Sequence, residues 1–162
     1  VTTPQYPYSC TKTYGHERGF SCAFRQWRAE SHCSKLHGYA LSFEIEFRAD
    51  ALDNRNWVVD FGAMDSFKQI LTYLFDHTTA VAADDPLLDV LRDADKQGLL
   101  NLRVFSQGVG CEMFAKQVYD LATGWLSSYE DNEAPAPRRT AIVHHVTVRE
   151  HGSNSATYYN PT

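Results

Sequence analysis

Long hydrophobic segments are missing from this sequence. No apolar run approaches the roughly 20 residues that a membrane-spanning helix requires, so we expect no membrane partner. The first ten residues, "VTTPQYPYSC", contain neither a basic segment nor an apolar stretch, and we find no signal peptide in them. Internal repeats are also missing, which excludes a solenoid. The sequence therefore predicts one domain over residues 1–162, located in the cytoplasm.

Cysteine and excess positive charge are scarce as well. The chain has four cysteines, and without a secretory signal we interpret them as reduced thiols. The formal net charge of −5 argues against bulk electrostatic attraction to nucleic acid or anionic lipid, so we expect neither as a partner. The hydrophobic fraction of 43% is ordinary for a soluble globular protein and is sufficient for a full core.

Alternating patterns predict several strands. Residues 39–48 alternate between apolar and polar side chains, as in a half-buried antiparallel strand, and His37 has the parity of the apolar face. Residues 142–150 form the closing strand, whose predicted inward face consists of Ile142, His144, Val146, Val148 and Glu150. Shorter strands are predicted in "YSCTKTY", "NWVVDF", "LLNLRVF" and "SATYY".

Helical patterns occupy the intervening segments. Apolar residues spaced three and four apart predict helices over residues 64–75, between Pro86 and Gly98, and from Cys111 onward. The polar stretch "SSYEDNEAPAPRR" is interpreted as a linker. The element order predicts an α+β fold, an antiparallel sheet with helices on one face. Because such a sheet leaves open edges, self-association is expected.

The segment "SHCSKLHGYAL" concentrates reactive side chains. Cys33 is adjacent to His32, and His37 follows with the spacing C-x3-H. A cysteine acts as a base or nucleophile only as its thiolate, which a nearby imidazolium, cation or metal can favour. A buried, unreactive cysteine beside two hydrogen-bonded histidines is the commoner alternative for any single cysteine.

Two further positions have side chains suited to catalysis or binding. Asp76 directly precedes His77 at the end of a predicted helix, where a carboxylate can orient an imidazole for proton transfer. Taken alone, the pair is better explained by a helix C-terminus that favours a cationic side chain, with Asp76 as a local cap. Glu150 ends an inward-facing row, so its carboxylate would suit a ligand edge with two adjacent N–H donors, unless the strand ends there in water.

Together these segments resemble the family of 6-pyruvoyltetrahydropterin synthase and 6-carboxytetrahydropterin synthase. The similar segments are "CSKLHGY", "NWVVDFGAM", "FDHTT", "GCEMFAKQVYD" and "VTVREHGSNSATYY", which occur in family order from about Tyr14 to Tyr159. The resemblance implies the tunnelling fold, in which subunits close barrels by oligomerisation, usually as hexamers. It also implies a 7,8-dihydroneopterin triphosphate substrate and a place in the synthesis of pterins or of deazapurines such as queuosine.

The resemblance assigns roles to individual residues. It implies that Cys33 is the general base, that Asp76 and His77 form its relay from a neighbouring subunit, and that Glu150 anchors the pterin edge. Glu112 is a second implied pterin contact, although Gly110 and Cys111 replace hydroxyl residues of the family just before it. Three basic side chains near Cys33 are candidates for holding the triphosphate: Arg25, Arg28 and Lys35.

The zinc site is where the sequence departs from the family. The family binds zinc through one histidine near the end of the first strand and two in a His-Gly-His box, but here the last is Tyr39. A phenol is a poor zinc ligand, because it must lose a proton of pKa near 10. One alignment register places Phe24 at the first ligand position and predicts no zinc. The other, which we favour, supplies His16, and a relocated zinc site would then consist of His16, His32 and His37.

Four functions follow from these patterns. The first is a 6-carboxytetrahydropterin synthase-like lyase, and the second is a non-catalytic pterin-binding member of the family. The third is an oligomeric scaffold in which Cys33 and His37 only pack, and the fourth is an enzyme with another pterin or purine substrate. His144, His145 and His151 are interpreted as structural or solvent-facing, with a ligand contact for His151 as an alternative.

Overall fold

The computed structural model describes residues 5–132 and 140–161. Helices α1, α2 and α3 span Asp65–Phe75, Leu88–Lys96 and Cys111–Asn132. Short 3-10 helices η1 and η2 span His16–Arg18 and His32–Ser34. The strands are β1 (Tyr8–Tyr14), β2 (Phe20–Phe24), β3 (His37–Ala49), β4 (Thr78–Ala82), β5 (Leu102–Phe105), β6 (Ala141–His151) and β7 (Asn154–Tyr159).

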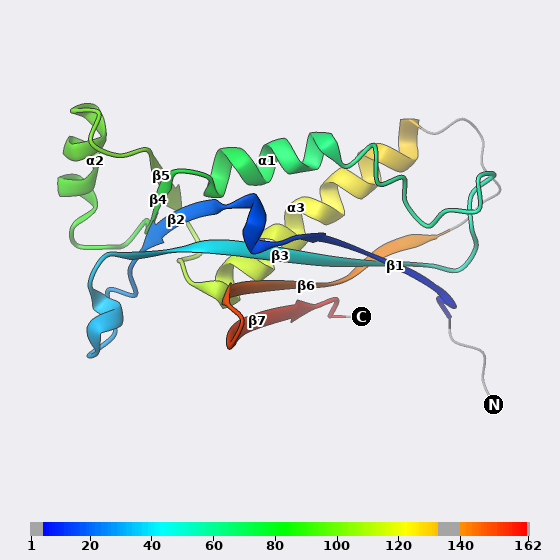
Figure 1. Ribbon diagram of the computed structural model, residues 1–162, viewed down its shortest axis with the longest axis horizontal. Coiled ribbons are helices and arrows are strands. Elements are labelled where there is room, and N and C mark those ends of the chain that lie inside the picture. The colour runs from blue at the N-terminus through cyan, green and yellow to red at the C-terminus, as the bar shows by residue number, and fades with distance from the viewer. Residues whose placement is uncertain (1–4, 133–139, 162) are drawn as a thin grey trace.

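One sheet organises the described chain. Its strand order is β5-β4-β2-β3-β6-β7, and β1 also pairs with β3. The pairs of β3 with β1, β2 and β6, and of β6 with β7, are antiparallel. Figure 1 shows α1 and α3 on the same side of the long strand β3, with α2 beyond the end of the sheet that β4 and β5 form. The predicted α+β class, with helices on one face of the sheet, is confirmed.

The core lies between this sheet and the two longer helices. Alternate residues of β3 are completely buried: Leu41, Phe43, Ile45, Phe47 and Ala49. Helix α1 places Phe67, Leu71 and Phe75 against this row, and the rings of Phe75 and Phe43 are 4.9 Å apart. Full burial of each such side chain contributes roughly 1.5–3 kcal/mol. The period of two along β3 and the spacing of three and four along α1 therefore determine which faces meet.

One local prediction was wrong, and two strands, β2 and β4, were missed. The segment "NWVVDF" is a turn rather than a strand, because the Asp53 carboxylate accepts hydrogen bonds from the backbone N–H groups of Arg55 and Trp57 at 2.8 and 2.9 Å. Strand β4 was not predicted at all. It lies between parallel neighbours β2 and β5 and is buried along its whole length, so it lacks the alternation of a half-exposed strand.

The closing strand is β6, and it contains a bulge that the sequence pattern does not reveal. His145 pairs with Glu46, whereas the next residue of β3, Phe47, pairs with Val143. His144 is therefore an extra residue of β6. The buried face of the strand consists of odd-numbered residues before it and of even-numbered residues after it. Val143, Val146 and Val148 are buried, while Ile142 and His144 do not share their face.

Three strands of the described sheet, β1, β5 and β7, each pair with a single strand, and the partner of β5 is β4. Strand β1 pairs with β3 alone and β7 pairs with β6 alone, within the part of the chain that is described. Both strands are largely exposed. Residues 127–132 of the expected linker continue α3, and residues 133–139 lie outside the described residues. Among the described helices, none combines the length and apolarity needed to cross a bilayer.

Candidate active site

Cys33 lies in a short segment that backbone hydrogen bonds hold in place. The side chain of Ser31 caps η2 by accepting a hydrogen bond from the Cys33 N–H at 3.3 Å. The Cys33 carbonyl accepts a hydrogen bond from the Gln26 N–H at 2.9 Å. The thiol itself is half-buried. The segment therefore positions a thiol that remains accessible to a ligand, as a general base requires.

A buried ion pair between Arg25 and Asp85 contacts the same segment. The Arg25 guanidinium donates to both oxygens of Asp85, at 2.8 and 2.9 Å, and the Asp85 side chain is only 1% exposed. A third N–H of Arg25 reaches the Ser34 carbonyl at 3.1 Å, one residue after Cys33. Burial alone would raise the pKa of Asp85, but hydrogen bonds from Arg25 and the Leu87 N–H outweigh it and lower that pKa.

The expected triphosphate-binding role of the basic side chains has little support in one protomer. Arg25 forms an ion pair with Asp85 at 2.8 Å, and Arg28 forms one with Asp84 at 2.6 Å. Both guanidinium groups would have to exchange a carboxylate for phosphate oxygens. Arg25 is instead placed to orient the Cys33 segment.

Tyr39 is influenced by two of the predicted functional residues, Cys33 and Glu150. Burial raises the pKa of its phenol, and electrostatic interactions with Glu150, Cys33 and Cys111 raise it further. An electrostatic effect of this kind weakens with distance, so these three side chains lie in the neighbourhood of the phenol. The His151 ring is also near, with its centroid 6.1 Å from that of Tyr39. Cys33 and Glu150 thus both lie in the neighbourhood of one tyrosine.

A cavity of about 390 Å³ brings the two predicted pterin contacts together. It is lined by Cys111, Glu112, Glu150, Ser153, Asn154 and Ser155. The amide of Asn154 donates to Glu150 at 3.4 Å. Burial, and then the charges of Glu150 and Glu112, raise the pKa of the Cys111 thiol to about 12, so this thiol stays protonated.

The chemistry of this cavity is that of a hydrogen-bond acceptor site. Two carboxylates, Glu112 and Glu150, face a space that could hold a small heterocycle, and they suit a ligand edge rich in N–H donors. Gly110 shapes the entry into α3 with a φ of +109°, and a Cβ at this position would collide with the side chain of Gln26. Sequence reasoning missed the contribution of Ser153, Asn154 and Ser155. The glycine turn "HGSNS" was the only signal for them.

Asp76 and His77 form a hydrogen-bonded pair, as the sequence suggested. His77 Nδ1 lies 2.8 Å from Asp76 Oδ1. The imidazole is 84% exposed, and its backbone has the left-handed φ of 54°, which is uncommon outside glycine. Within residues 5–132 and 140–161, the side chains of Asp76, His77 and Cys33 do not lie close enough together to hold one metal ion. The exposed dyad is therefore open to contact from outside the protomer.

The three predicted zinc ligands are not brought together. His16 is exposed and its Nδ1 donates to the Ala40 carbonyl at 2.6 Å, while His32 is exposed in η2. Opposite His37 in the sheet stands Phe24 rather than His16, with ring centroids 5.4 Å apart. The geometry therefore follows the register that we did not favour. Among the described residues, the one cluster of potential metal ligands consists of Glu46, His144 and His145.

The family zinc positions hold aromatic side chains in this chain. Phe24, His37 and Tyr39 pack against one another, with the His37 and Tyr39 rings 5.5 Å apart. His37 Nδ1 donates to the Lys35 carbonyl at 2.7 Å, which leaves one imidazole nitrogen there. The phenol of Tyr39, with its raised pKa, stays protonated. One imidazole and one phenol do not form the donor set of a zinc site, which needs at least three good ligands.

Comparisons with known proteins agree with this architecture. The chain matches the family model described as 6-pyruvoyl tetrahydropterin synthase over residues 13–161. A search of curated proteins found no match. Among solved structures, an uncharacterized protein from Wolinella succinogenes superposes with a TM-score of 0.77 at 20% identity, covering 94% of this chain and 98% of that one.

Two structures of named enzymes superpose less closely. A catalytic-residue mutant of 6-pyruvoyltetrahydropterin synthase from Plasmodium vivax has a TM-score of 0.64 at 14% identity, over 94% of this chain and 98% of that chain. The enzyme from Caenorhabditis elegans has a TM-score of 0.57 at 13% identity, over 94% of each chain. At these identities the superpositions establish a shared fold.

Proposed function

Because the chain belongs to the 6-pyruvoyl tetrahydropterin synthase family, we propose that it is a lyase of pterin metabolism that resembles 6-carboxytetrahydropterin synthase. Its proposed substrate is 7,8-dihydroneopterin triphosphate. The products would be 6-carboxytetrahydropterin, acetaldehyde and triphosphate, with one water consumed. This reaction would place the protein in the cytoplasm, in the synthesis of deazapurine precursors such as that of queuosine.

One observation supports the proposal most directly: within a single protomer, Cys33 and Glu150 both contribute to the raised pKa of the Tyr39 phenol, so both side chains lie in its neighbourhood. Glu150 and Glu112 line the cavity beside it and would accept the N–H groups of the pterin edge. The half-buried thiol of Cys33, as its thiolate, would remove a proton from the side-chain carbon next to the ring. The ring would take up the electron pair of that C–H bond and a proton, and the hydroxyl on the same carbon would become a ketone. Loss of the proton from the next carbon, C2′, would then expel triphosphate from C3′ with its electron pair.

The relay requires a second subunit. Asp76 holds His77 in one orientation, and the exposed imidazole would take the proton that Cys33 removes in a neighbouring protomer. The open edges of β1 and β7 offer a way to join protomers by continuing the sheet. We therefore propose a homo-oligomer, with the hexamer of the family as the expected state.

No catalytic step is assigned to zinc at the family position, because Phe24 and Tyr39 replace two of its ligands. In their place, Phe24 packs against the His37 ring, and Tyr39 presents a protonated phenol in the neighbourhood of Cys33 and Glu150. A phenol can donate a hydrogen bond to a side-chain oxygen of the substrate. Tyr39 would thereby orient the substrate hydroxyl that zinc polarises in relatives.

The experiment that tests the proposal separates binding from turnover. Replacement of the general base (Cys33→Ala) should reduce turnover of 7,8-dihydroneopterin triphosphate by at least about 100-fold, with unchanged affinity for a stable pterin such as neopterin. Cys10→Ala, which alters another half-buried thiol, is the matched control and should leave both unchanged. Full turnover by Cys33→Ala would remove this thiol from the mechanism.

A second candidate function follows from the same aromatic replacements. If Tyr39 cannot substitute for the missing ligands, the protein binds a pterin through Glu150 and does not turn it over. This candidate predicts saturable neopterin binding that Glu150→Ala abolishes, and no product from any dihydropterin triphosphate. Measuring binding and product in the same preparation distinguishes the two functions.

A further inference from the structure

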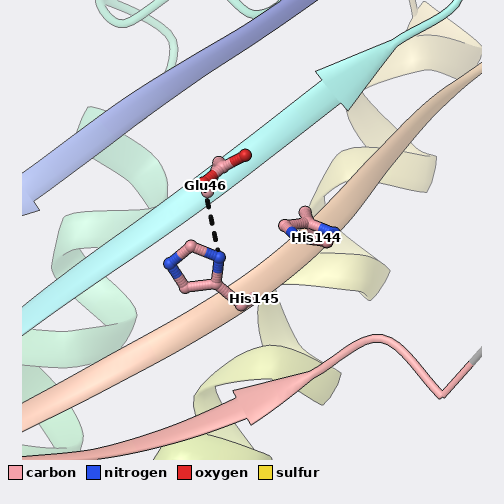
Figure 2. Close-up of side chains that lie close together, drawn as sticks. All are labelled: Glu46, His144 and His145. Atoms are coloured by element: carbon pink, nitrogen blue, oxygen red, sulfur yellow. Dashed lines mark ion pairs between the residues drawn. The ribbon is translucent and has the colours of Figure 1, made fainter. Parts of the chain in front are cut away.

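We propose that Glu46, His144 and His145 form a divalent metal site, separate from the pterin cavity. The three residues lie on the adjacent central strands β3 and β6, and their ligand atoms all lie within 4.8 Å of one another. Figure 2 shows the two imidazole rings and the carboxylate gathered above these strands. Two imidazoles and one carboxylate are a donor set of catalytic zinc sites, which leave a fourth position for water.

The bulge in β6 is what creates this cluster. Successive residues of a regular strand point to opposite faces, so adjacent histidines would normally diverge. Here His145 pairs with Glu46, and His144 is the additional residue of the bulge. Both rings are consequently on the same side, with centroids 5.4 Å apart. Bulges often redirect a side chain in this manner at functional positions.

His145 offers a buried imidazole nitrogen as a potential metal ligand. Its Nδ1 is fully buried and has no hydrogen-bond partner among the described residues. The nearest carboxylate oxygen, Glu46 Oε2, is 3.4 Å away. A tetrahedral zinc about 2.1 Å from each atom would hold them about 3.4 Å apart. The present separation thus accommodates the ion without a shift of either atom.

Surrounding charges orient the two ligands of this pair. Glu46 Oε1 accepts a hydrogen bond from Arg48 at 2.6 Å, which leaves Oε2 facing His145. On the far side of the ring, His145 Nε2 is 3.8 Å from Glu44 Oε1, and Arg149 holds the other oxygen of Glu44 at 3.6 Å. A carboxylate behind a metal-binding histidine commonly sets its tautomer and orientation. Glu44 is therefore a positioning residue of the proposed site.

This site is distinct from the pterin cavity. Glu150 lies five residues after His145 on β6, which corresponds to roughly 16 Å along a strand. The cluster also faces away from the core, because it has the opposite parity to Val146 and Val148. The ring centroid of Tyr159 on β7 lies 6.0 Å from that of His144 and 5.4 Å from that of His145. Failure of the metal site would leave the proposed pterin chemistry untouched.

Metal titration of the intact protein tests the proposal. Stripped protein is titrated with Zn²⁺, and with Co²⁺ as a spectroscopic probe, at pH 7.5. We expect one Zn²⁺ per protomer and the visible absorption of tetrahedral cobalt bound to nitrogen and oxygen. His144→Ala and His145→Ala should each weaken binding by at least tenfold, and Glu44→Gln should weaken it by about 10- to 100-fold.

Two controls make the result decisive. His37→Ala alters the family zinc position and His32→Ala alters an exposed histidine, and both should bind Zn²⁺ like the wild type. Circular dichroism and melting temperatures verify that each variant is folded, and Glu44→Gln keeps both proposed histidine ligands. The proposal is overturned by the absence of stoichiometric Zn²⁺ in the wild type, or by binding that His37→Ala removes and His145→Ala retains.

Discussion

The buried pair of Arg25 and Asp85 yields the most quantitative prediction. Asp85→Asn removes the charge from a side chain that is 1% exposed and leaves the Arg25 guanidinium without its bidentate partner. Breaking a buried pair by changing one partner costs about 3–5 kcal/mol. Because Arg25 is 17% exposed and can recover some hydration, we expect about 3 kcal/mol. For a chain of this length, that loss corresponds to a decrease of roughly 6–12 °C in melting temperature.

The neighbouring aspartate offers a matched control. Asp84 also pairs with an arginine, Arg28, but the two side chains are 59% and 66% exposed. Asp84→Asn should therefore change stability very little, since exposed ion pairs contribute little. Melting temperatures and urea midpoints of wild type, Asp84→Asn and Asp85→Asn are compared at pH 7. Equal effects of the two substitutions would refute the argument from burial.

The pH dependence provides an independent check on the same pair. The pKa of Asp85 is lowered from its ordinary value of 3.8 in the folded protein. A lowered carboxyl pKa contributes stability above the unfolded-state pKa, and this contribution is lost as the pH falls through the folded-state value. The stability difference between wild type and Asp85→Asn should therefore be constant from pH 7 to about pH 5 and shrink below about pH 4. A difference that grew on acidification would contradict the assignment.

Three further predictions concern the active site. Glu150→Ala should weaken neopterin binding by about 100-fold, since it removes two charge-assisted hydrogen bonds worth about 1.5 kcal/mol each; calorimetric titration checks this, and unchanged affinity would place the pterin elsewhere. The double substitution Phe24→His and Tyr39→His should add one zinc ion per protomer beside His37, beyond any that the wild type binds, as measured by elemental analysis; no gain of metal over the wild type would refute the geometry of the three positions. Co-expressed Cys33→Ala and His77→Ala subunits, each inactive alone, should recover about a quarter of wild-type turnover if one site uses both subunits; no recovery would place the relay within one protomer.

Much of the fold was predictable because its strongest signals are local. The alternation along β3 and the helical spacing of α1 each determine a buried face from sequence alone. Strand β4 escaped because a strand buried on both faces has no alternation. The turn around Asp53 escaped because side-chain hydrogen bonds to the backbone, rather than hydrophobic periodicity, organise it.

In the candidate site, too, some features were predictable from the sequence and others were not. Cys33, Glu112 and Glu150 were singled out from the sequence, and the structure places them near Tyr39 or in the adjoining cavity. The choice between His16 and Phe24 could not be made from one sequence, because it depends on which residue pairs with His37 across two strands. The bulge at His144 was equally invisible, since two adjacent histidines have the same pattern in a regular strand.

Product identification tests the central claim most directly. Purified protein is incubated with 7,8-dihydroneopterin triphosphate, with and without added zinc, and the products are analysed by mass spectrometry. We predict 6-carboxytetrahydropterin together with acetaldehyde, formed by the wild type and not by Cys33→Ala. Unchanged substrate under both conditions, from protein that binds neopterin, would contradict the account of this chain as a pterin lyase.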